Sequence, residues 1–365
     1  MSRGLRGIGA GAVACCALLL GPSAAMAAAG GDPHPVLDRG FSAGSRFLAA
    51  QVVGEGDAWS LDWEVRNRGP VSVAVSSDRG RTWDRVAQVA GHHLAVPADP
   101  AVPRPWFRLR SGGSTVVVAA RSLALPSVPN LRDLGGYRTA TGEWVRMGLL
   151  YRSNALTLSA ADKTTADSLG LRYVYDLRTA AEAGQAPDVV PAGATRELHD
   201  VMGAGVQGPA PTTPLQAADT MRAMERVFVD DPASRAEFGA VLADLATRDG
   251  AQLFHCTGGK DRTGWAAAVV LTLLGVDQDT VMQDYRLSDR YVLESPGTQA
   301  YLATLSPGDR AVTEAFVRAD PSYLQAGFDE VTARFGTMYE YATRGLGLTP
   351  QAISRLRSAF LESRR

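Results

Sequence analysis

The 365-residue chain has almost no lysine, little cysteine and no excess of either charge. Lysine and arginine together number 37, against 38 aspartate and glutamate residues, which gives a formal net charge of −1. Such a chain has no global basic field, so general attraction to nucleic acid or to anionic membranes is excluded. Any anion-binding site must therefore be local. Only two of the basic residues are lysines, Lys163 and Lys260.

Apolar runs long enough to span a membrane are also absent. The short apolar run near the N-terminus is typical of an export signal. Ile8–Leu20 has 13 residues, whereas a membrane anchor needs about 20 to span a bilayer. Arg3 and Arg6 precede the run, and the small residues of a cleavage site follow at Ala25–Ala27. We therefore expect residues 1–29 to be a removed signal peptide, the mature protein to be secreted, and no transmembrane segment to remain.

Cysteine is so scarce that an intramolecular disulfide is excluded in the mature chain. Cys15 and Cys16 lie inside the expected signal peptide, which leaves Cys256 alone. A single cysteine in an exported protein is either a buried inert thiol or a reactive one.

Residues 30–125 are expected to form a small β-sandwich. Short stretches with alternating apolar residues, separated by glycine-rich turns, are typical of half-buried antiparallel strands. These stretches are Trp59–Val65, Val71–Val75, Trp106–Leu109 and Thr115–Ala119. The pair His92 and His93 could bind a metal, but because no further ligand stands at a suitable spacing, a solvated loop is the simpler interpretation.

From residue 126 to 365 the pattern changes to strands that alternate with helices, which predicts an α/β domain with a central sheet flanked by helices. Buried strands are expected at Leu171–Asp176 and Ala251–His255. Helical spacing covers Leu156–Leu169, Arg235–Ala246, Gly264–Leu274 and Asp277–Leu287. Asp277 is expected to cap the last of these helices, and Gly275 to end the one before it. Residues 203–216 contain many helix breakers and are expected to be a surface loop or a mobile lid.

One stretch, His255–Gly264, carries most of the chemical information. It lies between an apolar strand and an apolar helix expected to begin at Trp265. Glycines let the backbone curl so that successive N–H groups point inward, and the helix N-terminus adds free donors and partial positive charge, which makes an anion cradle. This field favours a thiolate nucleophile at Cys256. Arg262 can close the ring with a planar fork for two phosphate oxygens, so the stretch predicts phosphoryl transfer to sulfur.

Two other interpretations of this stretch are weaker. A nucleotide-binding P-loop needs a glycine five residues before the Gly-Lys pair and Ser or Thr after it, but these positions hold Phe254 and Asp261. A structural turn around an inert cysteine would make the clustering of Cys, Gly, Lys, Asp, Arg and Thr a coincidence.

The string His-Cys-x-x-Gly-Lys-Asp-Arg-Thr-Gly resembles the signature loop of the cysteine-dependent protein tyrosine phosphatases, in the branch of bacterial secreted tyrosine/phosphoinositide phosphatases. Other segments resemble the same branch in the same order, so that the likeness covers residues 125–360. They are Asn130–Gly136, Leu150–Ser153, Asp176–Arg178 with Glu182, and Asp284–Tyr285. The preceding sandwich resembles the fibronectin-like module found before some of these domains.

The resemblance implies that Cys256 is the nucleophile and that Arg262 holds the phosphate and stabilises the transition state. It also implies that Thr263 donates a hydrogen bond to the sulfur and helps it to leave in the second step, and that His255 orients the loop. The phosphoryl oxygens would be held by main-chain N–H groups of Thr257, Gly258, Gly259, Lys260 and Arg262. No metal and no cofactor are implied.

The general acid stays open between several aspartates. Most tyrosine phosphatases supply it from a separate upstream loop, whereas the branch that this chain resembles is thought to use the aspartate inside the signature, here Asp261. Asp200 and Asp230–Asp231 are the other candidates. Asp261 could instead be a structural partner of Lys260 or Arg262.

Outside the loop, Asp176 and Arg178 follow an expected strand. The carboxyl ends of strands are where α/β sheets place their sites. We expect this pair to brace the loop as an ion pair and to take no part in the chemistry. Arg132, Asp133 and Gly135–Gly136 are expected to fix a turn and its packing.

The sequence therefore predicts an exported protein-tyrosine phosphatase that hydrolyses phosphomonoesters through a phosphocysteine, with phosphotyrosine proteins or phosphoinositides as substrates. The ammonium of Lys260 could meet a second phosphate on an inositol ring, or it could only shape the loop beside Asp261. Two alternatives stay open. A secreted inositol-phosphate hydrolase would need a strongly basic pocket, and a binding or adhesion protein acting through its sandwich would need to have lost Cys256 or Arg262.

Overall fold

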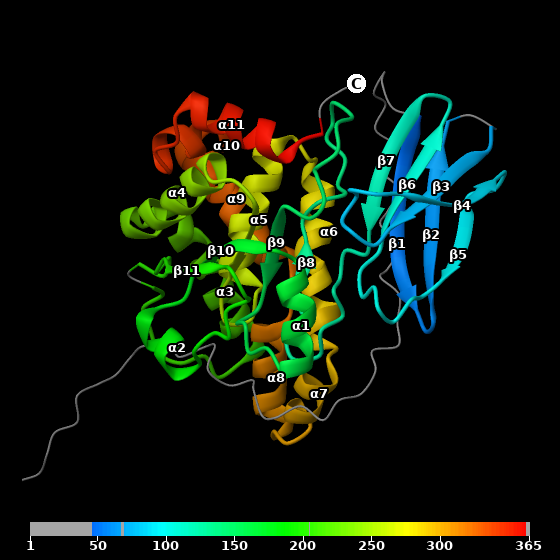
Figure 1. Cartoon of the computed structure of the whole chain (residues 1–365). Helices are drawn as coiled ribbons and strands as arrows, with labels where there is room; N and C mark the ends of the chain where they lie inside the picture. Colours follow the sequence, from blue (N-terminus) through cyan, green and yellow to red (C-terminus); the bar gives the residue numbers. More distant parts are fainter. Residues whose placement is uncertain (1–45, 67–68, 204, 363–365) are drawn as a thin grey trace, which may run out of the picture.

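The computed structural model describes residues 46–66, 69–203 and 205–362 (Figure 1). The expected signal peptide lies outside these residues. The described chain forms antiparallel sheets near its N-terminus and a mixed α/β unit after them, and the two stand side by side (Figure 1). This architecture confirms the fold class expected from the sequence.

Seven antiparallel strands form two sheets that face each other across an apolar core. One sheet has the order β1-β2-β5 and consists of β1 (Phe47–Glu55), β2 (Ala58–Val65) and β5 (His93–Pro97). The other has the order β4-β3-β6-β7 and consists of β4 (Asp84–Val89), β3 (Val71–Ser76), β6 (Trp106–Ser111) and β7 (Ser114–Ala119). Phe47, Leu61 and Phe107 are among the fully buried residues of this core.

The sequence pattern located four of these strands, β2, β3, β6 and β7, within a few residues, and missed the other three. Strand β4 exposes four of its six residues, so no buried alternation marks it. His93, expected in a solvated loop, lies instead in β5, and its Nδ1 atom is 3.0 Å from a carboxylate oxygen of Asp62. The backbone pairing of β5 with β2 accounts for this difference.

The central sheet of the α/β unit has the strand order β11-β10-β12-β9-β8. Its strands are β8 (Arg132–Asp133), β9 (Leu150–Ser153), β10 (Leu171–Asp176), β11 (Thr195–Leu198) and β12 (Ala251–His255). Strands β9 to β12 are parallel, and β8 is antiparallel to β9. The ladder places His255 beside Asp176 on one side and beside Ser153 on the other. Three carboxyl ends therefore meet at the edge where α/β sheets bind their ligands.

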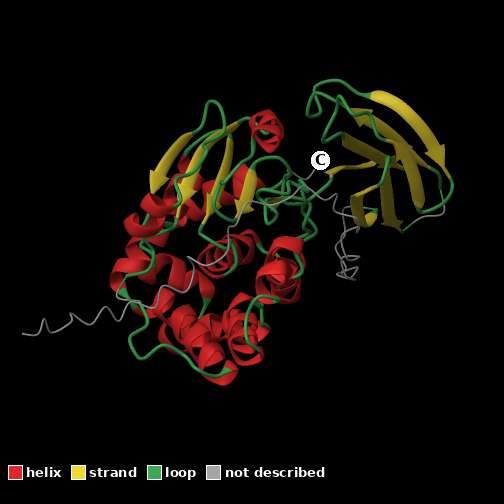
Figure 2. Ribbon diagram, turned by 90° about the horizontal axis from the view of Figure 1, so that it is seen from below, coloured by secondary structure: helices red, strands yellow, loops and turns green. Residues whose placement is uncertain are grey.

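Helices cover both faces of this sheet, with most of them on one side (Figure 2). Helix α1 (Ala160–Ser168) packs on the face that carries Tyr151, Val174 and Leu253. The opposite face is covered mainly by α3 (Pro214–Asp230), α4 (Pro232–Thr247), α5 (Asp261–Leu274), α6 (Gln278–Ser288), α9 (Pro321–Phe335) and α11 (Pro350–Phe360). The remaining helices are α2 (Ala180–Gln185), α7 (Pro296–Leu302), α8 (Pro307–Val317) and α10 (Met338–Glu340), with π-helical turns at Asp289–Leu293 and Tyr341–Gly345.

Helix α5 is the most buried helix of the core, and it begins earlier than expected. Its first residue is Asp261 and not Trp265, so the aspartate and arginine of the signature lie in its first turn. It ends at Gly275, whose left-handed φ of 94° suits glycine, and Asp277 caps α6 as expected. The expected loop at 203–216 ends at residue 213, because α3 begins at Pro214.

Helix α1 also differs from its expected range, since it begins at Ala160 after a Ser159 cap and not at Leu156. Among the described helices, none combines the length and the apolar character needed to cross a membrane.

A buried arginine joins the sandwich to the α/β unit. The Arg104 guanidinium donates to Asp133 Oδ2 at 2.6 Å, to the hydroxyl of Tyr151 at 3.0 Å and to the Ala120 carbonyl at 3.0 Å. Trp144 and Met147 of the α/β unit belong to the apolar core of the sandwich. The contact between the two units is therefore both ionic and apolar.

Candidate active site

The loop between β12 and α5 curls tightly around the sulfur of Cys256. The side chain is buried, and the Gly259 N–H donates to Sγ over 3.2 Å. Gly259 has a φ of 70°, and a Cβ there would lie 2.4 Å from the carbonyl oxygen of Ser153, at the end of β9. Only glycine fits this position, because any side chain would strain the backbone and push the loop off the sheet.

Arg262 is held at the mouth of this loop by Glu182, which lies on α2. The two Nη atoms of Arg262 each donate to a carboxylate oxygen of Glu182 at 2.7 Å, and Thr257 donates its hydroxyl to the same carboxylate at 2.8 Å. Burial alone would raise the pKa of Glu182, but the hydrogen bonds and charge of Arg262 lower it to about 2. A two-pronged contact of this kind fixes the plane of the guanidinium.

The outward-facing carbonyls of the loop are bound by buried side chains from other elements. Arg152 on β9 donates to the Gly259 carbonyl at 2.8 Å and to Asp284 on α6 at 2.6 Å. Asn130 donates to the Gly258 carbonyl at 3.0 Å. The carbonyl and the N–H of a trans peptide point in opposite directions. The N–H groups of Gly259 and Lys260, which belong to the same peptides as these carbonyls, therefore face inward, as in an anion cradle.

Behind the loop lie Asp176 and Arg178, which form the ion pair expected from the sequence, together with His255 and Asp188. His255 is fully buried, with Nδ1 3.1 Å from the Cys256 carbonyl oxygen and Nε2 3.2 Å from Asp188. Arg178 donates to both carboxylate oxygens of Asp176 at 2.8 Å and to Asp188 at 2.8 Å. Burial would raise the pKa of Asp176, but Arg178 and His255 lower it.

These groups fit an ion-pair network better than a metal centre. Asp176, Asp188 and His255 are close enough together to share an ion. However, Arg178 and Arg196 donate to both carboxylates, so two positive charges already occupy the oxygens that a cation would need.

Lys260 points toward the chain that follows α8. Its Nζ donates to the carbonyls of Phe316 and, at 2.8 Å, Arg318. The ammonium also lies 3.2 Å from Asp261 Oδ1 and over the ring of Tyr323. It therefore ties the signature loop to the segment between α8 and α9.

The four aspartates considered as general acids lie in different places. Asp261 is the first residue of α5, next to the loop, and is mostly buried. Asp200 accepts from the Met202 N–H, Asp230 pairs with Arg334, and Asp231 caps α4. Of the four, Asp261 alone belongs to the loop and helix that hold Cys256.

A cysteine sulfur that lies beside inward-facing N–H groups, with an arginine in the following helical turn, can accept a phosphoryl group from a substrate. A sequence model described as the tyrosine phosphatase family matches residues 123–362. The chain belongs to the tyrosine phosphatase family. The enzyme is a protein-tyrosine phosphatase of the cysteine-based kind expected from the signature loop.

Three relatives agree with this assignment. A Cupriavidus necator protein whose name assigns it to the tyrosine-protein phosphatases is 32% identical over 289 residues, which cover 76% of this chain and 98% of that protein. A tyrosine-protein phosphatase of Nostoc commune is 29% identical over 215 residues, covering 55% of this chain and 69% of that one. The triple specificity protein phosphatase PtpB of Mycobacterium tuberculosis is 28% identical over 282 residues, covering 65% and 98%.

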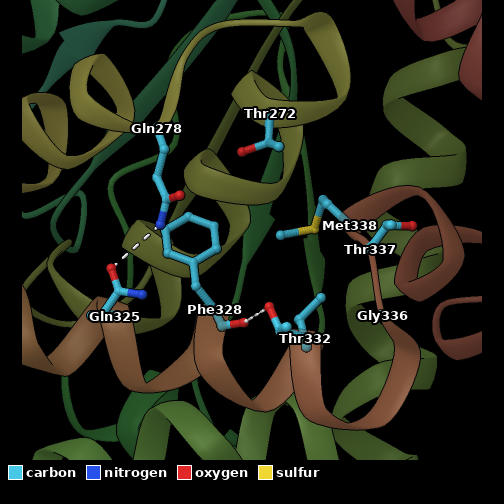
Figure 3. Close-up of a pocket in the computed structure, with 9 residues that line it drawn as sticks. Thr272, Gln278, Gln325, Phe328, Thr332, Gly336, Thr337 and Met338 are labelled. Atoms are coloured by element: carbon cyan, nitrogen blue, oxygen red, sulfur yellow. Dashed lines mark hydrogen bonds between the residues drawn. The ribbon is translucent and has the colours of Figure 1, made fainter.

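The phosphatase also has a cavity of about 200 Å³ among α5, α6, α9 and the start of α10 (Figure 3). Thr272, Gln278, Gln325 and Met338 are among its lining residues, and Gln278 donates to Gln325 over 3.3 Å. Thr272 lies about 16 Å along α5 from the signature loop at 1.5 Å per residue. The lining residues include neither a nucleophile nor a charged group, so this cavity does not have the chemistry of a phosphate site.

Two buried acids near the site were not recognised from the sequence. Asp188 follows α2 in an irregular segment, and no periodic pattern marks it. Glu225 could have been noticed, because it stands four residues after Met221 and three before Phe228 on the buried face of α3. A charged residue at such a position is unusual and signals a special environment.

Proposed function

We propose that this phosphatase hydrolyses phosphomonoesters through a covalent phosphocysteine on Cys256. The observation that carries the proposal is the Gly259 N–H donating to the enclosed sulfur at 3.2 Å, at the N-terminus of α5. Hydrogen bonds and partial positive charge at a helix N-terminus stabilise the thiolate, which is the reactive form. In the first step the thiolate attacks phosphorus and the bond to the leaving oxygen breaks.

Arg262 and the loop N–H groups stabilise the transition state in this proposal. Charge in phosphoryl transfer is spread over three equatorial oxygens, so several fixed donors act on it at once. The contact with Glu182 supports this role for Arg262, because it sets the plane of the guanidinium before substrate arrives. The main-chain donors are those of Thr257, Gly258, Gly259, Lys260 and Arg262.

Asp261 is the proposed general acid, which protonates the leaving oxygen and later takes a proton from the attacking water. Its place in the first turn of α5, one residue from Arg262, supports this choice over Asp200 and Asp230–Asp231. Thr263 follows Arg262 and is fully buried. We assign its hydroxyl to the sulfur as a hydrogen-bond donor when the thiolate leaves.

Phosphotyrosine proteins are the proposed principal substrates, and phosphoinositides the second class. The name of the M. tuberculosis relative, a triple specificity phosphatase, supports testing more than one class. Lys260 supports the second class, because it is one of only two lysines and adjoins the proposed general acid. A second phosphate would have to replace the carbonyls of Phe316 and Arg318 as partners of its ammonium.

A substrate panel tests the proposal. The mature enzyme is assayed with phosphotyrosine, phosphoserine and phosphothreonine peptides, with phosphoinositides and with soluble inositol phosphates, each with and without vanadate. We expect turnover of phosphotyrosine peptides and phosphoinositides that vanadate inhibits, and acid-quench trapping of phosphate on Cys256. Preference for soluble inositol phosphates over both classes would contradict the substrate assignment, and absence of a phosphoenzyme would contradict the mechanism.

Export is a separate part of the proposal. The motif at residues 1–29 supports secretion of a mature chain that lacks it. N-terminal sequencing of secreted protein is expected to start between Ala28 and Gly31, and a chain that keeps Met1 would contradict export by cleavage.

A further inference from the structure

Asp284 on α6 is a buried acid that holds one support of the signature loop in place. Its Oδ2 atom accepts a hydrogen bond from Arg152 Nη1 at 2.6 Å. The other terminal nitrogen, Arg152 Nη2, donates to the carbonyls of Gly259 at 2.8 Å and Lys260 at 3.3 Å. A guanidinium that is bound at both terminal nitrogens has a fixed plane. The position of Asp284 therefore determines where these two loop carbonyls are held.

A second support of the loop depends on the same carboxylate. Arg132 donates from Nε to Asp284 Oδ1 at 3.1 Å, and from Nη1 to the side-chain oxygen of Asn130. Asn130 in turn donates to the Gly258 carbonyl at 3.0 Å. Burial would raise the pKa of Asp284, but the charges of Arg132 and Arg152 hold it well below its usual range. Asp284 is thus an anion to which both supports of the loop are connected.

A third donor reaches Asp284 from the segment between β8 and β9. The hydroxyl of Tyr137 donates to Asp284 Oδ1 at 2.8 Å, and the tyrosine is buried. This donor is neutral, whereas the two arginines are charged. Its hydroxyl can therefore be removed without changing the charge of the cluster.

Arg121 holds Tyr137 from the side of the sandwich. It directly follows Ala120, a residue of the apolar core of the sandwich. Its guanidinium carbon lies 3.7 Å from the centre of the Tyr137 ring, and its Nη1 atom donates to the carbonyls of Gly135 at 2.7 Å and Asp133 at 3.2 Å. A cation over the face of an aromatic ring attracts the ring. The ring of Tyr137 is therefore placed by a residue whose own position depends on the sandwich.

We propose that the sandwich positions the signature loop through Arg121, Tyr137 and Asp284, with Tyr137 and Asp284 as positioning residues. The inference rests on the proposed role of the loop N–H groups in holding the phosphoryl oxygens. A loop carbonyl that shifts re-aims the N–H of the same peptide, because the two groups share one plane. Displacements of about 1 Å are enough to cost much of the rate. Loss of the Tyr137 hydroxyl is therefore expected to lower kcat.

Tyr137→Phe tests the hydroxyl, since it keeps the ring beside Arg121. On a phosphotyrosine peptide we expect kcat to fall about fivefold or more and KM to stay within about twofold of wild type. The inhibition constant of vanadate, which is bound like the transition state, is expected to rise by a factor similar to the fall in kcat. A wild-type kcat, or a higher KM with unchanged kcat, would overturn the inference.

Tyr175→Phe is the matched control. It removes an equally buried hydroxyl, which donates to Gln252 at 2.7 Å instead of to Asp284. We expect both variants to unfold at lower urea concentration than the wild type, because each loses one buried hydrogen bond. Only Tyr137→Phe is expected to lose kcat. Equal losses of kcat in the two variants would overturn the inference, since they would follow from lowered stability alone.

Arg121→Met tests the link to the sandwich. It removes the cation from the ring of Tyr137 and leaves an apolar side chain in its place. If Arg121 acts through Tyr137, the double variant has a kcat within about twofold of the more impaired single variant, because the two losses do not add. Losses that multiply in the double variant would overturn the inference. If Tyr137→Phe does not fold, a fall of kcat at constant KM in Arg121→Met supports the inference, and a wild-type kcat there overturns it.

Cys256→Ser separates this inference from the proposed function. Turnover by Cys256→Ser would overturn the phosphocysteine mechanism, and the inference with it. An inactive Cys256→Ser together with a wild-type kcat in Tyr137→Phe would overturn the positioning role alone and leave the proposed function in place.

Discussion

Replacing Glu182 with glutamine should weaken the folded state by an amount that depends on pH. The pKa of Glu182 falls from 4.5 to about 2 in the folded protein. At about 1.4 kcal/mol for each pKa unit, this difference corresponds to about 3 kcal/mol of stabilisation by the ionised form. Because 21% of the side chain is exposed, solvent screening lowers the expected value to about 2 kcal/mol.

The sign of the pH dependence follows from the direction of the shift. The folded-state pKa lies below the unfolded one, so this stabilisation is fully present above about pH 4.5 and is lost as pH falls toward 2. Glutamine does not titrate there. The difference in free energy of unfolding between wild type and Glu182→Gln should therefore narrow by about 1 kcal/mol between pH 7 and pH 3.5.

Urea unfolding at the two pH values measures this difference, with the exposed Glu294→Gln as the control. Activity gives an independent readout, because Arg262 loses the anion that fixes its plane. We expect kcat/KM of Glu182→Gln to fall about tenfold or more. The reasoning from the Arg262 contact would be refuted if Glu182→Gln were as stable as the wild type at pH 7. It would also be refuted if the difference in free energy of unfolding between the two proteins stayed constant with pH.

Four further predictions concern other residues of the molecule. Cys256→Ser should abolish turnover and still bind substrate in equilibrium titrations, since the loop donors remain; residual phosphoenzyme would count against the assignment. Arg262→Lys should lose at least about 10² in kcat, because a point charge cannot replace the fork, and steady-state kinetics within tenfold of wild type would disprove this. Arg104→Met should lower the free energy of unfolding by about 3 kcal/mol, since it leaves Asp133 buried with main-chain donors alone; in a double-mutant cycle with Asp133→Asn, additive losses would be the contrary result. Lys260→Ala should lower kcat/KM on phosphoinositides more than on phosphotyrosine peptides, and equal losses would remove the argument for the lipid substrate.

The signature loop could be placed from the sequence because its geometry is local. A strand, five loop residues and a helix N-terminus determine where the N–H groups point, whatever packs around them. The start of α5 was misplaced by four residues because Asp261 and Arg262 are polar, and the apolar pattern becomes visible only at Trp265. Both polar residues are nevertheless buried, and Arg262 finds its partner, Glu182, on another element.

Contacts that join distant segments could not be predicted in the same way. Arg262 and Glu182 are 80 residues apart in sequence, and Arg104 and Tyr151 are 47 apart. The strand order β11-β10-β12-β9-β8 is likewise a property of the whole sheet. Asp188 meets His255 only because β10 and β12 are neighbours, so no spacing in the chain announces it.

The contact through Arg104 shows that the part of the chain that matches the family is not the part that folds as one unit. The family match begins at residue 123, just after β7, yet Trp144 and Met147 within it complete the apolar core of the sandwich. A relative that dispensed with the sandwich would expose these two side chains and strip Asp133 of its cation. A relative without the sandwich would therefore need compensating substitutions at Trp144, Met147 and Asp133. In this protein the start of the family match at residue 123 is not a boundary between two independently folding parts.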